Sequence, residues 1–378
     1  MTEQGLKRVK IARIVVFFVL LAYVLFFIII NASTFSADNV SRFFFNVRSA
    51  LGGNIAKDQE IDFEESNKNT ISMFKDGLVI LNQKKLSVYS RDNIEMQSVT
   101  VNFTNPTLKK SNNYIVTFDR TGTVLNLHDS FNVIAQKVFN EKIINATVND
   151  SGYVAVVTAT FGYKAKVTVL NSKLEDLYYW YSSKTNVIDV VFSTNNIISV
   201  VGIVSELGSI DTKIHRINFR TGEEQIVYTI DDSFPLGIVM KTDNSTEILT
   251  DNGLYNLSAD GVRKLFNYDA SSIESFYQDV RHSVFVRVSD IAQNMFQVDA
   301  VSSTGAYLFS KEYPDVRSVS CSYDLFYILS ENYIYMLDNE GNELRKIEIL
   351  YSANSVVCNQ DIVFVLGSNY ALKTNISE

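Results

Sequence analysis

The residue types that hold metal ions or perform nucleophilic chemistry are scarce in this 378-residue chain. It contains three histidines, His128, His215 and His282, and no two of them have the spacing of metal ligands. Zinc sites draw on clustered Cys, His and carboxylate side chains, and the sequence shows no such cluster. We therefore expect no metal site and no bound cofactor.

Two cysteines, Cys321 and Cys358, occupy the same place in two similar segments, SVSCSYDLFYILSENYIYML and SVVCNQDIVFVLGSNYALKT. A disulfide needs Cα atoms within about 7 Å of each other, whereas sheets that pack face to face lie about 10 Å apart. If the two segments form the inner strands of neighbouring sheets, we expect two buried thiols and no disulfide.

Nucleophilic triads, glycine-rich phosphate loops and HExxH motifs are also missing from the sequence. Paired carboxylates, such as Glu223 and Glu224, fall in expected turns, where solvated surface charge is their ordinary role. The sequence therefore predicts a protein that is not an enzyme. The alternative is an envelope enzyme or a small-ligand sensor that uses polar residues around a central channel, with these candidates: Ser72, Asp189, Glu274, Ser320 and Asn354.

Both cysteine segments belong to a repeat that runs through most of the chain. Alternating apolar residues, a polar turn and a second alternating run recur about every 41 residues. Alternation is typical of β-strands, and two hairpins per period are typical of four-stranded propeller blades. We predict an all-β, eight-bladed β-propeller over residues 59–378, with seven blades as the alternative.

The last repeat supplies only three strands, and an open ring would leave an unpaired strand edge. Ile61 and Phe63 alternate in the stretch Glu60–Ser66, just before the first blade. We predict that this stretch pairs with Asn369–Asn375 and closes the last blade. The three prolines fall at expected connections between blades, where no ladder hydrogen bond is lost: Pro106, Pro235 and Pro314.

Residues 14–30 are seventeen apolar residues without a charge, long enough to form a helix of about 26 Å that spans a bilayer. Four basic residues precede them, so the positive-inside rule places the N-terminus, residues 1–13, in the cytoplasm. We expect a single-pass plasma-membrane protein with an extracytoplasmic propeller; the alternative is a cleaved signal peptide. The net charge of −8 makes nucleic acid an unsuitable partner.

A linker, residues 31–58, joins this segment to the propeller. Val40, Phe43, Phe44 and Val47 recur there at helical spacing and predict a short amphipathic helix. Phe43, Phe44 and Val47 are candidates for contact with the membrane surface. Packing under the propeller and contact with a partner are the other interpretations.

Inserted residues lengthen the loops between the second and third strands in the third, fourth and sixth blades. Such loops emerge on one face of a propeller, where binding usually resides. They carry the candidate residues for binding a partner: Phe161, Tyr163, Leu207, Ile210, Ile291 and Met295. Trp180, in the aromatic run LYYWYSS, is a further candidate, although packing between blades is the favoured role for that run. Hairpins that pack on each other are the alternative for the loops.

The turn phrases NFRTGEE, LSADGVRKL and LDNEGNEL resemble repeats of the pyrroloquinoline-quinone-like propeller superfamily, which includes quinoprotein dehydrogenases and a lipid-anchored scaffold of outer-membrane protein assembly. The blade-docking tryptophan of quinoprotein repeats is missing, and Tyr228, Phe266 and Phe309 stand near its place. The chain also resembles uncharacterised membrane-anchored propellers of Gram-positive bacteria. The missing tryptophan argues against a bound quinone, and the second resemblance implies no known activity. The apolar anchor, the uniform ring and the lack of catalytic motifs lead us to expect a membrane-tethered, non-enzymatic scaffold that binds another envelope protein.

Overall fold

The computed structural model describes residues 38, 40–42, 44–45, 47, 60–66, 68–206, 208–258, 261–268, 273–359 and 362–375. The chain divides into two compact units, Met1–Ile55 and Ala56–Glu378. In the first unit the described residues are helical, and Phe44 is 64% exposed. Phe43 and the apolar segment 14–30 lie outside the described residues. Among the residues that are described, no helix is long and apolar enough to cross a membrane.

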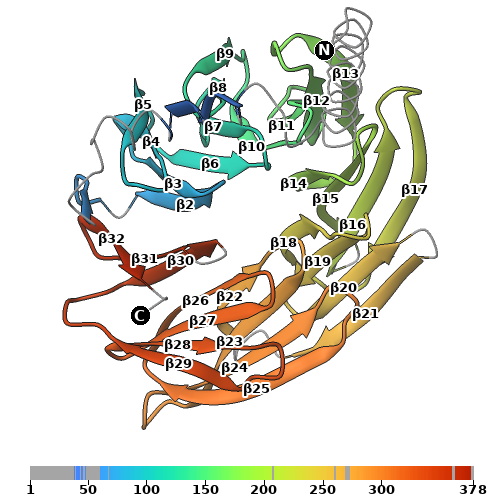
Figure 1. The fold of residues 1–378 in the computed structure, drawn as a ribbon. Helices are drawn as coiled ribbons and strands as arrows, with labels where there is room; N and C mark the ends of the chain where they lie inside the picture. The colour runs from blue at the N-terminus through green and yellow to red at the C-terminus, as the bar shows by residue number, and fades with distance from the viewer. Residues whose placement is uncertain are drawn as a thin grey trace, which may run out of the picture. The chain divides into compact units, whose positions relative to one another are not determined.

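The second unit forms eight antiparallel sheets of four strands each, arranged as the blades of a propeller (Figure 1). Blades 1 to 4 comprise β2 (Thr70–Phe74), β3 (Gly77–Leu81), β4 (Lys85–Tyr89) and β5 (Glu95–Thr100); β6 (Pro106–Lys110), β7 (Ile115–Asp119), β8 (Val124–His128) and β9 (Val133–Val138); β10 (Ile143–Val148), β11 (Val154–Thr158), β12 (Ala165–Leu170) and β13 (Asp176–Ser182); β14 (Asn186–Phe192), β15 (Ile197–Glu206), β16 (Ser209–Asn218) and β17 (Glu223–Ile230).

Blades 5 to 8 comprise β18 (Pro235–Met240), β19 (Thr246–Thr250), β20 (Gly253–Ser258) and β21 (Gly261–Asn267); β22 (Ile273–Gln278), β23 (His282–Asp290), β24 (Met295–Ser302) and β25 (Tyr307–Pro314); β26 (Val316–Ser322), β27 (Leu325–Ser330), β28 (Tyr333–Leu337) and β29 (Glu343–Glu348); β30 (Ser355–Asn359), β31 (Ile362–Leu366), β32 (Tyr370–Asn375) and β1 (Glu60–Asp62). The prediction of eight blades is confirmed, and the alternative of seven is wrong.

Alternation along the strands produces the packing between blades. In β3, Leu78 and Ile80 pack on blade 8, whereas Val79 and Leu81 pack on blade 2. Successive side chains of a strand point to opposite faces of its sheet, so β3 is apolar on both faces and fully buried. The second strands of blades 3 and 8, β11 and β31, are apolar and buried in the same way, apart from Thr158 at the end of β11. Eight buried apolar clusters result, one at each interface between neighbouring blades, and together they form a continuous ring of core.

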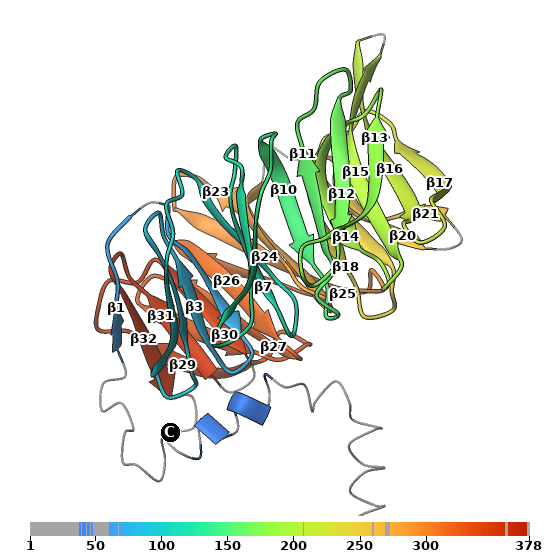
Figure 2. The ribbon, with the colours of Figure 1, turned by 90° about the horizontal axis from the view of Figure 1, so that it is seen from above.

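The last blade is closed by strands from both ends of the propeller, as predicted. β1 pairs antiparallel with β32, and Ile61 lies opposite Ala371. The amide of Phe63 continues this pairing by donating a hydrogen bond of 2.8 Å to the carbonyl of Asn369. Figure 2 shows β1 at the outer edge of this blade, beside β32. Ile61 is 5% exposed and packs against Phe364 of the same blade and Leu78 of blade 1.

All three prolines lie at the predicted connections. Pro106 and Pro235 are the first residues of inner strands β6 and β18, and Pro314 is the last residue of outer strand β25. At these positions a missing N–H removes no hydrogen bond from the middle of a ladder. Cys321 and Cys358 lie on the inner strands β26 and β30, and both are buried free thiols, as expected.

The closure makes Ile61 a sensitive position. We expect Ile61→Ala to lower the free energy of unfolding by about 2–5 kcal/mol, because it leaves a cavity at the junction of blades 8 and 1. Thermal unfolding of the full chain measures this effect, with Glu60→Ala on the exposed side of β1 as the matched control. Equal melting temperatures for the two variants would contradict a structural role for β1.

Candidate functional site

The two ends of the ring carry different kinds of residues. Because all inner strands run the same way around a propeller, the loops between second and third strands emerge at the end where inner strands begin. The turns between first and second strands lie at the opposite end. The β15–β16 hairpin has two ten-residue strands and extends beyond its neighbours (Figure 2).

Most of the predicted partner-binding residues are exposed on the loop end. Phe161 is fully exposed in the β11–β12 loop, and Ile291 is 87% exposed in the β23–β24 loop. Tyr163 and Ile210 are about half exposed, whereas Met295 is partly buried in β24. Leu207 lies outside the described residues.

Blade 5 adds two exposed apolar residues that the sequence analysis missed. Phe234 and Leu236 flank Pro235 in the connection from blade 4 to blade 5. The amide of Ser233 donates a hydrogen bond of 2.9 Å to the carbonyl of Ile210, so this connection lies against the long hairpin. The proline at a predicted blade connection was the available signal for this position. We call the exposed residues of blades 3 to 6 the apolar sector: Phe161, Tyr163, Ile210, Phe234, Leu236 and Ile291.

Trp180 lies at an interface between blades. Its ring centroid is 4.9 Å from that of His215 in blade 4, and it packs on the apolar cluster shared by blades 3 and 4. Because side chains alternate along β13, its neighbours Tyr179 and Tyr181 are exposed instead. The Lys166 ammonium lies 4.5 Å from the centroid of the Tyr179 ring. Trp180 therefore has the packing role that the sequence favoured for this run.

The predicted channel residues do not converge on one point. Asp189 is buried, its carboxylate lies 3.6 Å from the Lys109 ammonium of blade 2, and burial raises the pKa of Asp189 while Lys109 opposes this rise. Ser320 Oγ lies 3.1 Å from Cys358 Sγ. Glu274 and Asn354 are exposed, and Ser72 is partly buried. The described part of the channel thus contains polar pairs between blades.

A hollow of about 440 Å³ lies beside the closure of the ring. Its lining comes from blade 8, including Asn354 and Val357, and from the chain that leads from β1 into blade 1, including Phe63 and Ile71. The sequence analysis did not predict this hollow, because only the pairing of β1 with β32 brings its two walls together.

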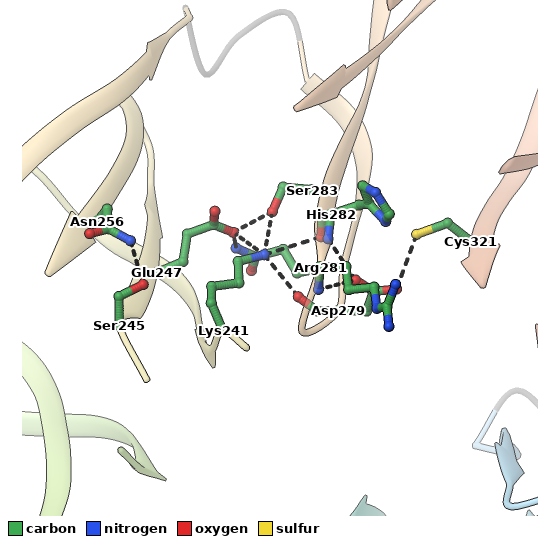
Figure 3. Close-up of polar contacts among 10 residues, drawn as sticks. Lys241, Ser245, Glu247, Asn256, Asp279, Arg281, His282, Ser283 and Cys321 are labelled. Atoms are coloured by element: carbon green, nitrogen blue, oxygen red, sulfur yellow. Dashed lines mark hydrogen bonds and ion pairs between the residues drawn. The ribbon is translucent and has the colours of Figure 1, made fainter. Parts of the chain in front are cut away.

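A buried ion pair lies at the opposite end of the ring from the loops (Figure 3). Lys241 follows inner strand β18, Glu247 lies on β19, and their charged atoms are 2.8 Å apart with neither side chain exposed. The Lys241 ammonium also donates to the carbonyls of Asp279 and His282 in blade 6, at 2.8 and 3.2 Å. Gln278 donates to the Glu247 carboxylate at 3.0 Å. These bonds tie blade 5 to blade 6.

A second polar cluster continues this contact into blade 7. Asp279, His282 and Cys321 each offer an atom that can bind a metal, and these atoms lie within 4.8 Å of one another. Asp279 comes from the β22–β23 turn, His282 is the first residue of β23, and Cys321 comes from inner strand β26. The expectation that the chain has no cluster of Cys, His and carboxylate groups is therefore wrong. The ring brings together residues that the sequence separates by about 40 positions, close to one repeat.

The other two histidines have structural surroundings. The His128 ring is fully buried in blade 2, Nε2 lies 2.9 Å from Thr117 Oγ1, and burial lowers the pKa of His128 to about 4. His215 lies 2.9 Å from Thr185 Oγ1 and 2.5 Å from the Glu224 carboxylate.

The chain is thus an eight-bladed β-propeller. It has exposed apolar residues at one end of the ring and a buried polar cluster at the other. The chain belongs to a family, described as "Family of unknown function (DUF5711)", whose model matches residues 53–369. A comparison with curated proteins found no match.

Several solved structures share the fold at low sequence identity. BamB from Moraxella catarrhalis is 12% identical, with a TM-score of 0.54 over 83% of this chain and 98% of that one. Sqt1 from Saccharomyces cerevisiae is 12% identical, with a TM-score of 0.58 over 85% and 100%. The C-terminal WD40 domain of Sif2 is 10% identical, with a TM-score of 0.59 over 84% and 97%. At these identities the likeness shows the β-propeller fold alone.

The buried ion pair leads to a prediction for stability. We expect Lys241→Met to lower the free energy of unfolding by about 3–5 kcal/mol, because it leaves the Glu247 carboxylate buried without its cation. The double variant Lys241→Met with Glu247→Leu removes both charges and should recover most of this loss. Chemical denaturation of the native chain, of Lys241→Met, of Glu247→Leu and of the double variant measures the coupling. Additive losses in the double variant would show that the two charges act independently.

The buried neutral His128 predicts a pH dependence. Its pKa is about 4 in the folded chain and about 6.5 when unfolded, so the unfolded state binds more protons between these values and stability falls as the pH falls from 6.5 towards 4. At pH 5 the loss from this one group is about 2 kcal/mol relative to pH 7.5. Melting temperatures at the two pH values should therefore differ more for the native chain than for His128→Gln. Identical differences would contradict the assignment.

Proposed function

We propose that this chain is a membrane-tethered, extracytoplasmic scaffold that binds another protein of the cell envelope and performs no chemistry itself. The N-terminus is cytoplasmic, and the apolar segment 14–30 anchors the propeller to the plasma membrane. The observation that carries the binding role is the apolar sector, which extends over four successive blades.

The apolar sector has the composition of a partner site. Phe161 and Ile291 expose nearly all of their side chains to water, although burying each would be favourable by about 1.5–3 kcal/mol. Contiguous exposed apolar groups with a polar rim are typical of protein interfaces. Because the loops rest on packed blades, they are held in place before a partner arrives, which lowers the entropic cost of binding.

The rim of the sector indicates the chemistry of the partner. Glu206, Asp231 and Asp232 are exposed carboxylates at the tip of β15 and in the connection beside Phe234. Lys164 is an exposed basic residue of the same rim, beside Tyr163. A partner with an apolar centre and with basic residues opposite the acidic part of the rim, around Ile210 and Phe234, fits this surface, since opposite charges at a rim speed association and select partners. Nucleic acid does not fit it.

The polar groups of the channel support a role without catalysis. Lys109 of blade 2 lies against Asp189 of blade 4, and Lys241 lies against Glu247 within blade 5, so each of these described charges has a partner of opposite sign. The family match carries no activity, and a propeller by itself does not decide between binding and catalysis. The proposal therefore rests on the surface.

A pull-down of the full chain from gently solubilised membranes tests the proposal. We expect one defined envelope protein to copurify with the native chain. The double variant Phe161→Ser with Ile291→Ser should reduce its recovery at least about tenfold, because two exposed anchors of the interface are lost.

The control replaces an exposed apolar residue away from the apolar sector. Val133 is 41% exposed at the start of the outer strand β9 in blade 2, at the opposite end of the ring from the loops, and Val133→Ser should leave recovery unchanged. Failure to recover any partner, or an equal loss with Val133→Ser, would overturn the proposal.

A further inference from the structure

The cluster of Asp279, His282 and Cys321 brings three potential metal ligands together. The proposed scaffold role does not use these residues. They come from blades 6 and 7, at the end of the ring opposite the apolar sector, and Figure 3 shows them beside Lys241 and Glu247. His282 and Cys321 are 5% and 3% exposed. Groups of this kind rarely meet in a buried place by packing alone, because each is costly to bury without a partner.

The β22–β23 turn holds two of the three residues in fixed positions. One carboxylate oxygen of Asp279 accepts hydrogen bonds of 2.7 Å from the amides of Arg281 and His282. Lys241 binds the carbonyls of Asp279 and His282 from the adjacent blade. The turn is therefore held by hydrogen bonds within it and by the hydrogen bonds from Lys241. The second carboxylate oxygen of Asp279 accepts a hydrogen bond from Cys321 Sγ, 3.3 Å away.

A second, independent observation that points to a ligand comes from His282. Its Nδ1 is buried and, among the described residues, has no hydrogen-bond partner. The ring is held by an edge contact with Phe326, with centroids 4.9 Å apart. An unpaired buried nitrogen costs about 1–3 kcal/mol, and a bound cation would offset this cost. His128 Nδ1 is also unpaired, but among the described residues His128 does not belong to a cluster of metal-binding groups, whereas His282 does.

We propose that Asp279, His282 and Cys321 bind a divalent transition-metal ion, and that zinc fits them best. Thiolate, imidazole and carboxylate are the three kinds of side chain that bind zinc in proteins. With Zn–S near 2.3 Å and Zn–N or Zn–O near 2.0–2.2 Å, ligand atoms in a tetrahedral site lie about 3.3–3.8 Å apart. The separations of up to 4.8 Å therefore need an inward movement of about 1 Å.

The ion would replace a proton. In the metal-free chain the Cys321 thiol donates to Asp279, and burial keeps the thiol protonated by raising its pKa. Metal binding breaks the S–H bond, forms the S–metal bond and releases the proton to solvent. Three protein ligands leave a fourth position for water. The site would thus tie blade 6 to blade 7.

Cys358 provides a matched control. It lies on the next inner strand, at the equivalent place in its repeat, and is equally buried. Its Sγ is 3.1 Å from Ser320 Oγ and is not a member of the cluster. A variant of Cys358 therefore removes the only other thiol of the chain without changing the proposed ligands.

Titration with Co²⁺ tests the site in the full-length protein, purified in detergent and stripped with a chelator. We expect one equivalent to bind, with a thiolate-to-cobalt absorption band in the near ultraviolet that added Zn²⁺ abolishes. Cys321→Ser should remove the band, His282→Gln and Asp279→Asn should weaken binding at least about tenfold, and Cys358→Ser should leave both unchanged. Circular dichroism of each variant establishes that it is folded.

Absence of the band in the native chain would overturn the proposal, as would its persistence in Cys321→Ser or its loss in Cys358→Ser. If Cys321→Ser does not fold, His282→Gln and Asp279→Asn decide the question by the affinity for Co²⁺. Because no partner protein is needed, failure here leaves the scaffold proposal standing, and success does not depend on it.

Discussion

The pairing of β1 with β32 is the contact on which the rest of the ring depends. A propeller blade buries both faces against its neighbours, so a blade without its fourth strand would leave an apolar edge and an incomplete core. Here three residues, Glu60–Asp62, complete blade 8 and place Ile61 between blades 8 and 1. The first strand of the propeller therefore joins the last, and the eight apolar clusters form a closed circle.

The two ends of the closed ring carry different kinds of connections between strands. At the loop end, the chain reverses between second and third strands, and added residues in blades 3, 4 and 6 extend the surface without disturbing the core. At the opposite end, the tight turns after the inner strands bring polar groups of neighbouring blades within hydrogen-bond distance, as the Lys241 ammonium and the backbone carbonyl of Asp279 show. The loop end suits contact with a large partner, and the turn end suits a small ion.

The repeat in the sequence predicted the fold correctly. The same repeat separates the residues of the polar cluster, so the sequence did not predict that cluster. The period of about 41 residues and the alternation of apolar residues led to eight blades, to the closing strand and to the prolines between blades. The same period places His282 and Cys321 nearly one repeat apart, and ligand motifs are sought over much shorter spacings. The sequence did not predict Phe234 and Leu236 as exposed binding residues, because blade 5 has no lengthened loop between its second and third strands.

The sequence by itself determined the kind of strand at each position, the number of blades and the segment that closes them, because period-two patterning and repeat length are local properties of the chain. Only the tertiary structure decided which side chains meet. The register of β13 places Trp180 at the interface between blades and Tyr179 in solvent. Asp189 forms an ion pair with Lys109, which lies two blades away. Contacts between blades depend on the rotation of each sheet around the ring, and no short stretch of sequence encodes that rotation.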